Sequence, residues 1–153
     1  MARSTALTGA AGEHFVAFRL AQLGFPAALT RGGSPSVDVL VGDSDGNAAI
    51  SIQVKTSSGA RREFKRDPSK NRWEFDVGAK ALRLRGSSIF YVFVDLRYDA
   101  AAMPDAFIVP SDNVASSQNP QDSRFMFWIS EDQAPEYRER WDRITARLKP
   151  THP

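Results

Sequence analysis

Hydrophobic and polar residues alternate in two segments that flank a short polar loop. In residues 37–41 and 50–55, branched aliphatic side chains occupy every second position, which is typical of half-buried strands. The loop between them contains Asp45-Gly46, a pair that tolerates the positive φ angles of a two-residue hairpin turn. The pattern therefore predicts a β-hairpin.

The position of the turn predicts which residues face each other. With the turn centred on Asp45-Gly46, cross-strand partners have residue numbers that sum to 91. Asp38 then lies opposite Gln53, and Lys55 follows two residues along on the same face. A shift of one residue would mix this polar face with the aliphatic one. The hairpin is expected to present a carboxylate, an amide and an ammonium together.

Helices and further strands are predicted on both sides of the hairpin. A helix is expected from Thr8, as N-cap, to Leu23, with Glu13 on the face that carries Val16 and Leu20. The apolar run 87–96 predicts a buried central strand. Further strands are expected at 73–77, 106–109 and 125–129, with a loop or short edge strand at 27–30. Short helices are expected at 78–86 and 111–114. A closing helix is expected at 130–149, and its buried stripe is Tyr137, Trp141, Ile144 and Leu148.

Aromatic residues of the predicted strands are expected in the core, because they sit in alternating or continuously apolar segments. Trp128 belongs to this group, and Trp73 is expected to be the most exposed of them. Together the elements indicate an α/β (α+β) fold.

Composition narrows the class of protein. The 153 residues are 42% hydrophobic and 25% charged, as in an ordinary globular protein, and one domain over residues 1–153 is expected. The chain has no cysteine, which excludes disulfides, thiolate nucleophiles and thiolate metal sites. No apolar segment has the length of a signal peptide or a membrane span, so a cytoplasmic location is expected.

Basic residues concentrate in one segment. The net charge is only +2, yet residues 61–85 hold nine basic and four acidic side chains. This asymmetry favours a polyanionic partner, although a solvated basic loop would have the same composition. The candidate nucleic-acid contacts are Arg61, Arg62, Lys65, Arg66, Lys70 and Arg72.

Acidic, amide and basic residues occur in a definite order along the expected helix and hairpin. Glu13 lies on the helix, Asp38 on the first hairpin strand, and Gln53-Val54-Lys55 on the second. This arrangement resembles the PD-(D/E)XK nuclease superfamily, in particular its Holliday-junction-resolvase-like and restriction-endonuclease-like members, over residues 8–95. Val37 replaces the name-giving proline, and Gln53 replaces the usual Glu or Asp.

The resemblance implies a fold and an activity. The fold would be a central mixed β-sheet flanked by helices, with an αβββαβ core and an extra C-terminal strand and helix over residues 104–149. The activity would be hydrolysis of DNA with Mg²⁺ or Mn²⁺, hard cations that prefer oxygen ligands. Asp38, Glu13, the Gln53 amide and the Val54 backbone carbonyl would be metal ligands, and Lys55 would orient or deprotonate the attacking water. Small nucleases of this kind commonly form homodimers.

The same residues are also compatible with simpler roles. Asp38 and Lys55 could form a diagonal ion pair on a solvated strand face, with Gln53 as filler. Glu13 could be a first-turn residue that the helix dipole favours. Gln53 could also mark a nuclease-fold module that binds DNA without cleaving it.

Overall fold

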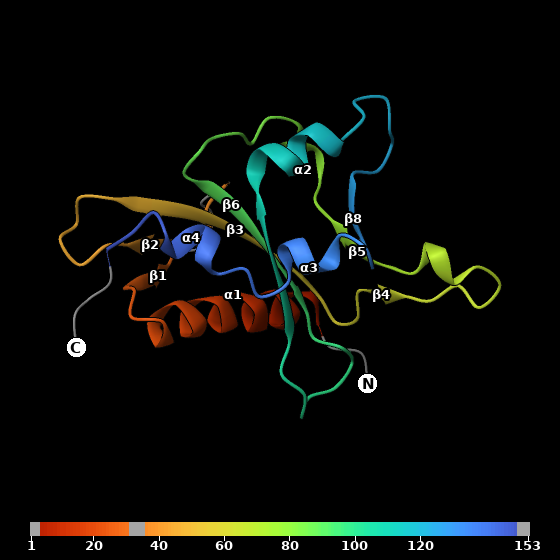
Figure 1. Cartoon of the computed structure of the whole chain (residues 1–153), viewed down its shortest axis with the longest axis horizontal. Coiled ribbons are helices and arrows are strands. Elements are labelled where there is room, and N and C mark those ends of the chain that lie inside the picture. The colour runs from red at the N-terminus through yellow and green to blue at the C-terminus, as the bar shows by residue number, and fades with distance from the viewer. Residues whose placement is uncertain (1–3, 31–35, 150–153) are drawn as a thin grey trace.

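Two β-sheets form the framework of the protein (Figure 1). The computed structural model describes residues 4–30 and 36–149. Within them, the larger sheet has the strand order β1-β2-β3-β6-β7, and the smaller has the order β4-β5-β8. The strands are β1 (Ala27–Leu29), β2 (Val39–Gly42), β3 (Ala49–Ser57), β4 (Arg61–Arg62), β5 (Arg72–Asp76), β6 (Ile89–Asp95), β7 (Asp105–Pro110) and β8 (Met126–Ser130).

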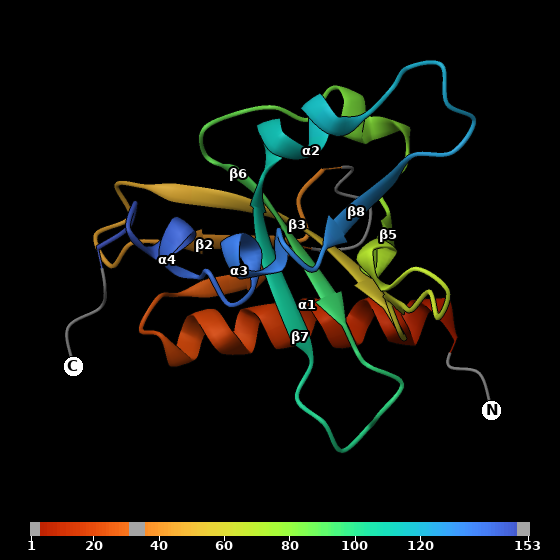
Figure 2. The ribbon, with the colours of Figure 1, turned by 45° about the vertical axis from the view of Figure 1, so that its right-hand side comes forward.

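Helices lie around these sheets. The longest, α1 (Thr5–Gln22), runs along the larger sheet in both ribbon views (Figures 1 and 2). The others are α2 (Ser111–Ser117), α3 (Ala134–Tyr137), α4 (Asp142–Thr145) and two 3₁₀ turns, η1 (Pro68–Lys70) and η2 (Ala79–Leu82). None of the helices in the described part combines the length and the apolar character that crossing a membrane requires.

The larger sheet is the middle layer, because it carries a hydrophobic core on each face. On β6, Phe90, Val92 and Val94 belong to the core shared with α1 and α4, whereas Tyr91 and Phe93 belong to the other. The second core lies between the larger sheet and the smaller sheet with α2 and α3. The sequence of β6 is continuously apolar because both of its faces are buried.

The predicted hairpin register is confirmed. Val39 pairs with Ile52 and Val41 with Ile50, as expected from a turn centred on Asp45-Gly46. The turn itself is wrong in detail: Asp43 N–H bonds to the Ala48 carbonyl at 3.1 Å, so four residues form the loop. Gly46 has a positive φ of 71°, and Asp45 does not. Because the longer loop has the same centre, the register is unchanged.

The order of elements around the hairpin differs from the prediction in one respect. The strand at 73–77 is expected beside the hairpin in a nuclease-like core, but β5 pairs with β4 and β8 in the smaller sheet. The short edge strand β1 supplies the third strand of the αβββαβ order instead, and β3 pairs directly with β6 in parallel. The central mixed sheet flanked by helices is confirmed.

Both terminal helices differ from their predicted bounds. Helix α1 begins at Thr5 rather than after Thr8, since Ser4 is the N-cap and its side chain accepts a hydrogen bond from Leu7 N–H at 3.2 Å. The predicted C-terminal helix is interrupted: Glu139 has a φ of 54°, and its N–H bonds to the Ala106 carbonyl of β7. A contact with the sheet edge replaces the helical bond at that point.

This interruption distributes the predicted apolar stripe over both faces of the sheet. Tyr137 packs in the second core, while Trp141, Ile144 and Leu148 pack in the first. All four are buried, so their burial is confirmed, but a single helix with one buried face is wrong.

The burial of two tryptophans is the opposite of what was expected. Trp73 is 8% exposed and lies in the second core, whereas Trp128 is 53% exposed. In β8 the buried positions are Phe127 and Ile129, which leaves Trp128 on the outer face of the smaller sheet. The exposure of Trp128 was not predicted because the strand alternates between its two faces within a sequence that is apolar throughout.

Two glycines in α1 offer a matched test of helix packing. A Cβ at Gly12 would lie 1.8 Å from Thr56 Oγ1, whereas a Cβ at Gly9 would meet nothing within 4 Å. We expect Gly12→Ala to destabilise the protein by more than about 1 kcal/mol through overpacking. Gly9→Ala should stabilise it by about 0.5–1 kcal/mol, because alanine favours a helix interior. Urea unfolding measures both; equal effects of the two substitutions would contradict the close approach of α1 to β3.

Candidate active site

Asp38 is fixed at the start of the hairpin by hydrogen bonds to β3. Its N–H donates to the Ile52 carbonyl at 2.9 Å, which extends the β2–β3 pairing beyond Val39. Its Oδ2 accepts from Gln53 Nε2 at 2.6 Å and from Val54 N–H at 2.8 Å. The predicted juxtaposition of Asp38 and Gln53 is therefore present, and the carboxylate has a defined orientation.

Glu13 approaches the same carboxylate from α1. It follows Gly12, where the missing side chain lets the helix lie directly against Thr56 of β3. Burial raises the pKa of Glu13, the negative charge of Asp38 raises it further, and His14 lowers it. Glu13 is thus half-buried and within the electrostatic influence of Asp38, unlike a helix residue that only faces solvent.

Lys55 lies on β3, on the same face as Gln53. Both residues line a cavity of about 60 Å³, here called the Lys55 cavity. Asp38 and Lys55 make no ion pair within 4.0 Å, although both belong to the described residues. The simple diagonal ion pair is therefore wrong.

Sequence reasoning missed several residues around Lys55. Tyr91 pairs with Gln53 across the parallel β3–β6 ladder, and Ser36 and Lys80 also line the Lys55 cavity. Burial raises the pKa of Tyr91 to about 12, so its phenol keeps its proton even in moderately alkaline solution. The long-range parallel pairing places Tyr91 here, and Lys80 comes from η2, so nothing in their local sequence could have indicated either position.

The site has only part of a cation-binding ligand set. Among residues 4–30 and 36–149, no three His, Cys, Asp or Glu side chains gather closely enough to hold a metal. Glu13 and Asp38 are two electrostatically coupled acidic groups, and Gln53 presents its amide nitrogen to Asp38. Oxygen ligands of this kind suit Mg²⁺ or Mn²⁺, with water completing the shell.

A wider hollow lies on another side of Lys55. It has a volume of about 210 Å³ and is here called the Glu74 hollow. Lys55, Arg62, Glu74, Asp76 and Arg124 contribute its charged groups, so it joins the candidate site to the smaller sheet.

The predicted nucleic-acid contacts differ in whether their charged groups already contact other residues of the protein. Arg61 and Arg72 stack on Trp73 and Trp128 and also pair with Glu131 and Glu74, respectively. The remaining members are more exposed, and they project from β4 and the β4–β5 connection. Arg62 pairs with Glu74 at 3.6 Å, Lys70 pairs with Asp67 at 3.3 Å, and Lys65 and Arg66 have no acidic partner within 4.0 Å among the described residues.

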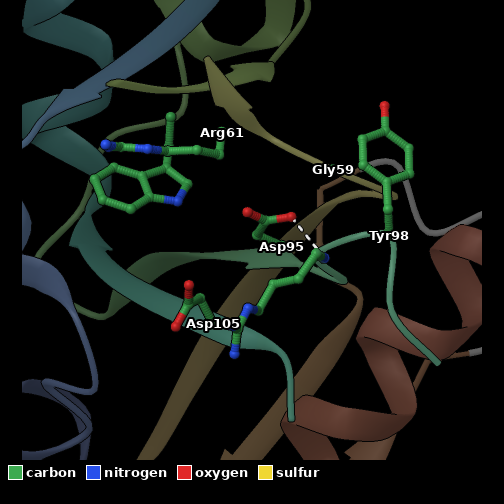
Figure 3. A pocket seen from close by; sticks show the side chains of 7 residues that line it. Gly59, Arg61, Asp95, Tyr98 and Asp105 are labelled. Atoms are coloured by element: carbon green, nitrogen blue, oxygen red, sulfur yellow. Dashed lines mark hydrogen bonds between the residues drawn. The ribbon is translucent and has the colours of Figure 1, made fainter. Parts of the chain in front are cut away.

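Another hollow, of about 300 Å³, lies beyond the end of β6 (Figure 3). The buried Asp95 carboxylate accepts hydrogen bonds there from Ala60 N–H and Arg97 N–H, both at 2.9 Å. The second bond, dashed in Figure 3, holds Arg97 at a φ of 60°. Asp95 therefore stabilises a turn, and this hollow has no link to the Asp38 carboxylate.

The arrangement of strands and helices matches that of a solved nuclease. The bacterial homing endonuclease I-Ssp6803I is 19% identical, with a TM-score of 0.60, over 94% of this chain and 93% of that one. The chain has a nuclease fold. Hjc, a Holliday junction resolvase from Archaeoglobus fulgidus, is 16% identical with a TM-score of 0.48, over 88% of this chain and 93% of that one.

At the sequence level, no protein-family model and no curated protein matches the chain. The nuclease-like, restriction-endonuclease-like fold that the Glu13, Asp38 and Gln53-Val54-Lys55 pattern predicted is confirmed. The roles of these five residues remain predictions, because the similarity concerns the fold.

The coupling of Glu13 to Asp38 predicts a pH-dependent stability without metal. A raised pKa means that the folded state disfavours ionised Glu13, so this carboxylate costs stability at neutral pH. The cost disappears as the pH falls through the raised pKa towards the unfolded value of 4.5. We expect Glu13→Gln to raise the melting temperature near pH 7 in EDTA by less than about 4 °C, and the gain to vanish near pH 4.

The exposed Glu63 supplies the control for this measurement. Glu63→Gln should not increase stability at neutral pH, because the Glu63 side chain is largely in solvent and lies 3.8 Å from Arg61 Nε. A gain from Glu13→Gln that persisted unchanged in acid would contradict the coupled-carboxylate arrangement.

Proposed function

We propose that this protein is a metal-dependent DNA endonuclease that hydrolyses phosphodiester bonds. One observation carries the proposal: the Asp38 carboxylate accepts hydrogen bonds from Gln53 and Val54, next to Lys55 on β3, and its charge acts on the half-buried Glu13 of α1. Charged groups on an inner strand face and a half-buried helix residue would be a poor choice for solubility alone. The nuclease fold supports the same activity.

Each residue has a distinct proposed role. Asp38, Glu13 and the Val54 backbone carbonyl would hold Mg²⁺ or Mn²⁺, and a rotated Gln53 amide would add a neutral oxygen. The cation supplies charge neutralisation at the phosphate and a more acidic water. Lys55 would orient that water and stabilise the charge that develops on the phosphoryl oxygens. Lys80, which lines the same cavity, adds a second ammonium near the phosphate position.

DNA is the proposed partner. Arg62, Lys65, Arg66 and Lys70 are exposed around β4 and its connection to β5, and they would contact phosphates. Arg61 and Arg72 would act mainly by holding Trp73 and Trp128 in place.

The proposed unit is a single domain, since both cores share the larger sheet. A homodimer in the cytoplasm would place two such sites on one DNA duplex. The C-terminal segment 134–149 offers little apolar surface for self-association, because its residues Tyr137, Trp141, Ile144 and Leu148 are buried within the chain.

A second candidate is a nuclease-fold module that binds DNA without cleaving it. The hydrogen bond from Gln53 Nε2 to Asp38 favours this candidate, because a neutral donor occupies the position where a third anionic ligand is usual. Such a module would show DNA affinity that falls steeply with salt, and no cleavage with any divalent cation.

Cleavage assays with matched variants test the first proposal. The protein is incubated with Mg²⁺ or Mn²⁺ and with supercoiled, single-stranded and branched DNA. We expect cleavage of at least one of them, and a loss of about 100-fold or more in Asp38→Asn and in Lys55→Met, because each removes charge stabilisation from the reacting phosphate.

Asp45→Asn and Lys149→Met are the matched controls. These two exposed residues pair with each other at 3.9 Å at the far end of the hairpin, so both variants should cleave normally. Unchanged cleavage by Asp38→Asn and Lys55→Met would contradict the site assignment.

Calorimetric titration with Mn²⁺ separates the two candidates. Gln53→Glu restores a third carboxylate beside Asp38, and we expect it to tighten Mn²⁺ binding by about 10-fold, because affinity for hard cations rises with ligand charge. Gln53→Met removes the amide and should weaken it. Binding that neither substitution changed would show that Gln53 has no part in a cation site.

A further inference from the structure

The outer face of the smaller sheet exposes a large aromatic side chain on a rigid support. Trp128 is 53% exposed on β8, where alternation turns it away from the second core. The guanidinium carbon of Arg72 lies 3.9 Å from its ring centroid and 4.9 Å from that of Phe64. Arg72 therefore packs against one side of the indole and links it to a second ring.

Glu74 prevents Arg72 from moving away. Its Oε1 accepts a hydrogen bond from Arg72 Nε at 2.9 Å and lies 2.8 Å from Nη2, and its Oε2 is 3.6 Å from Arg62 Nε. Glu74 also lies directly opposite Trp128 across the β5–β8 pair. The indole is thus held by a network of charged groups rather than by apolar contacts alone, although folding would favour burying it.

A hollow of about 350 Å³ lies beside the indole, within the size range of small-ligand sites. We call it the Trp128 hollow. Arg72, Met126 and Trp128 line it together with Ser117, Ser130 and Gln133, whose side chains can form hydrogen bonds. An aromatic plane with polar groups around it suits a flat heterocycle with polar edges, as found in a nucleobase.

The Trp128 hollow and the Glu74 hollow share a lining residue. Met126 lines both the Trp128 hollow and the Glu74 hollow, and Lys55 lines the latter. The exposed Arg62 and Arg124 also line the Glu74 hollow. A DNA strand with its phosphates along these arginines could reach Lys55 and Trp128 at the same time.

We infer that the Trp128 hollow binds an unpaired base of the DNA strand whose backbone passes Lys55. Stacking on an indole requires a base that has left its own stack, so the site selects single-stranded or locally unpaired DNA over intact duplex. The inference rests on the proposed nuclease function for the identity of the strand, and it adds the kind of DNA that the site prefers.

The test measures binding in EDTA, where no cleavage is required. Of the three tryptophans, Trp73 and Trp141 are buried, so quenching of indole emission reports mainly on Trp128. We expect a single-stranded oligonucleotide to quench the unmodified protein. The Trp128 variants lack the reporting indole, so their affinity is measured by the fluorescence anisotropy of a dye-labelled oligonucleotide, and we expect Trp128→Ala to weaken binding by about 10-fold, as loss of one stacked base would. Trp128→Phe keeps an aromatic plane and should retain most of the affinity. Binding of the matching duplex should change less than about 2-fold.

Phe18→Ala is the control, because Phe18 is an aromatic residue of α1 that is 55% exposed. It should leave binding of both DNA forms unchanged. Equal losses for single strand and duplex in Trp128→Ala, or no quenching of the unmodified protein, would overturn the inference. A lowered oligomeric mass in Trp128→Ala with unchanged DNA affinity would also overturn it, in favour of a contact between two copies. Cleavage that persists with any of these results would leave the nuclease proposal standing.

Discussion

The pairing of β2 with β3 is the constraint on which the candidate site depends. It places Asp38 opposite Gln53, and it directs the Val54 N–H to the Asp38 carboxylate. The same pairing buries the aliphatic face against α1, and this contact brings Glu13 to the site. Core formation and site assembly therefore share one register, so a slipped hairpin would lose both at once.

The hairpin could be predicted from sequence because its information is local. Period-two alternation defines the faces, and the turn centre defines the register even though the loop is longer than expected. The helix residue Glu13 could be predicted for a similar reason, since its position follows from helical periodicity. These local patterns were sufficient for most of the proposed site.

Long-range pairing could not be predicted in the same way. Nothing in residues 73–77 indicates whether that strand joins the larger sheet or the smaller one, and nothing near Tyr91 indicates its position beside Gln53. The exposure of Trp128 was missed because every residue from Phe125 to Ile129 is apolar, which conceals the alternation. The helix interruption at Glu139 depends on a hydrogen bond to Ala106, far away in sequence.

That interruption also determines how the edges of the larger sheet are protected. Arg138 forms a bridge with Phe107, so the C-terminal segment crosses the outer side of β7 as it passes from one core to the other. The opposite edge is the three-residue strand β1, too short to recruit a neighbouring chain efficiently. The C-terminal segment thus covers part of this edge and connects the two cores, because it contributes buried side chains to both.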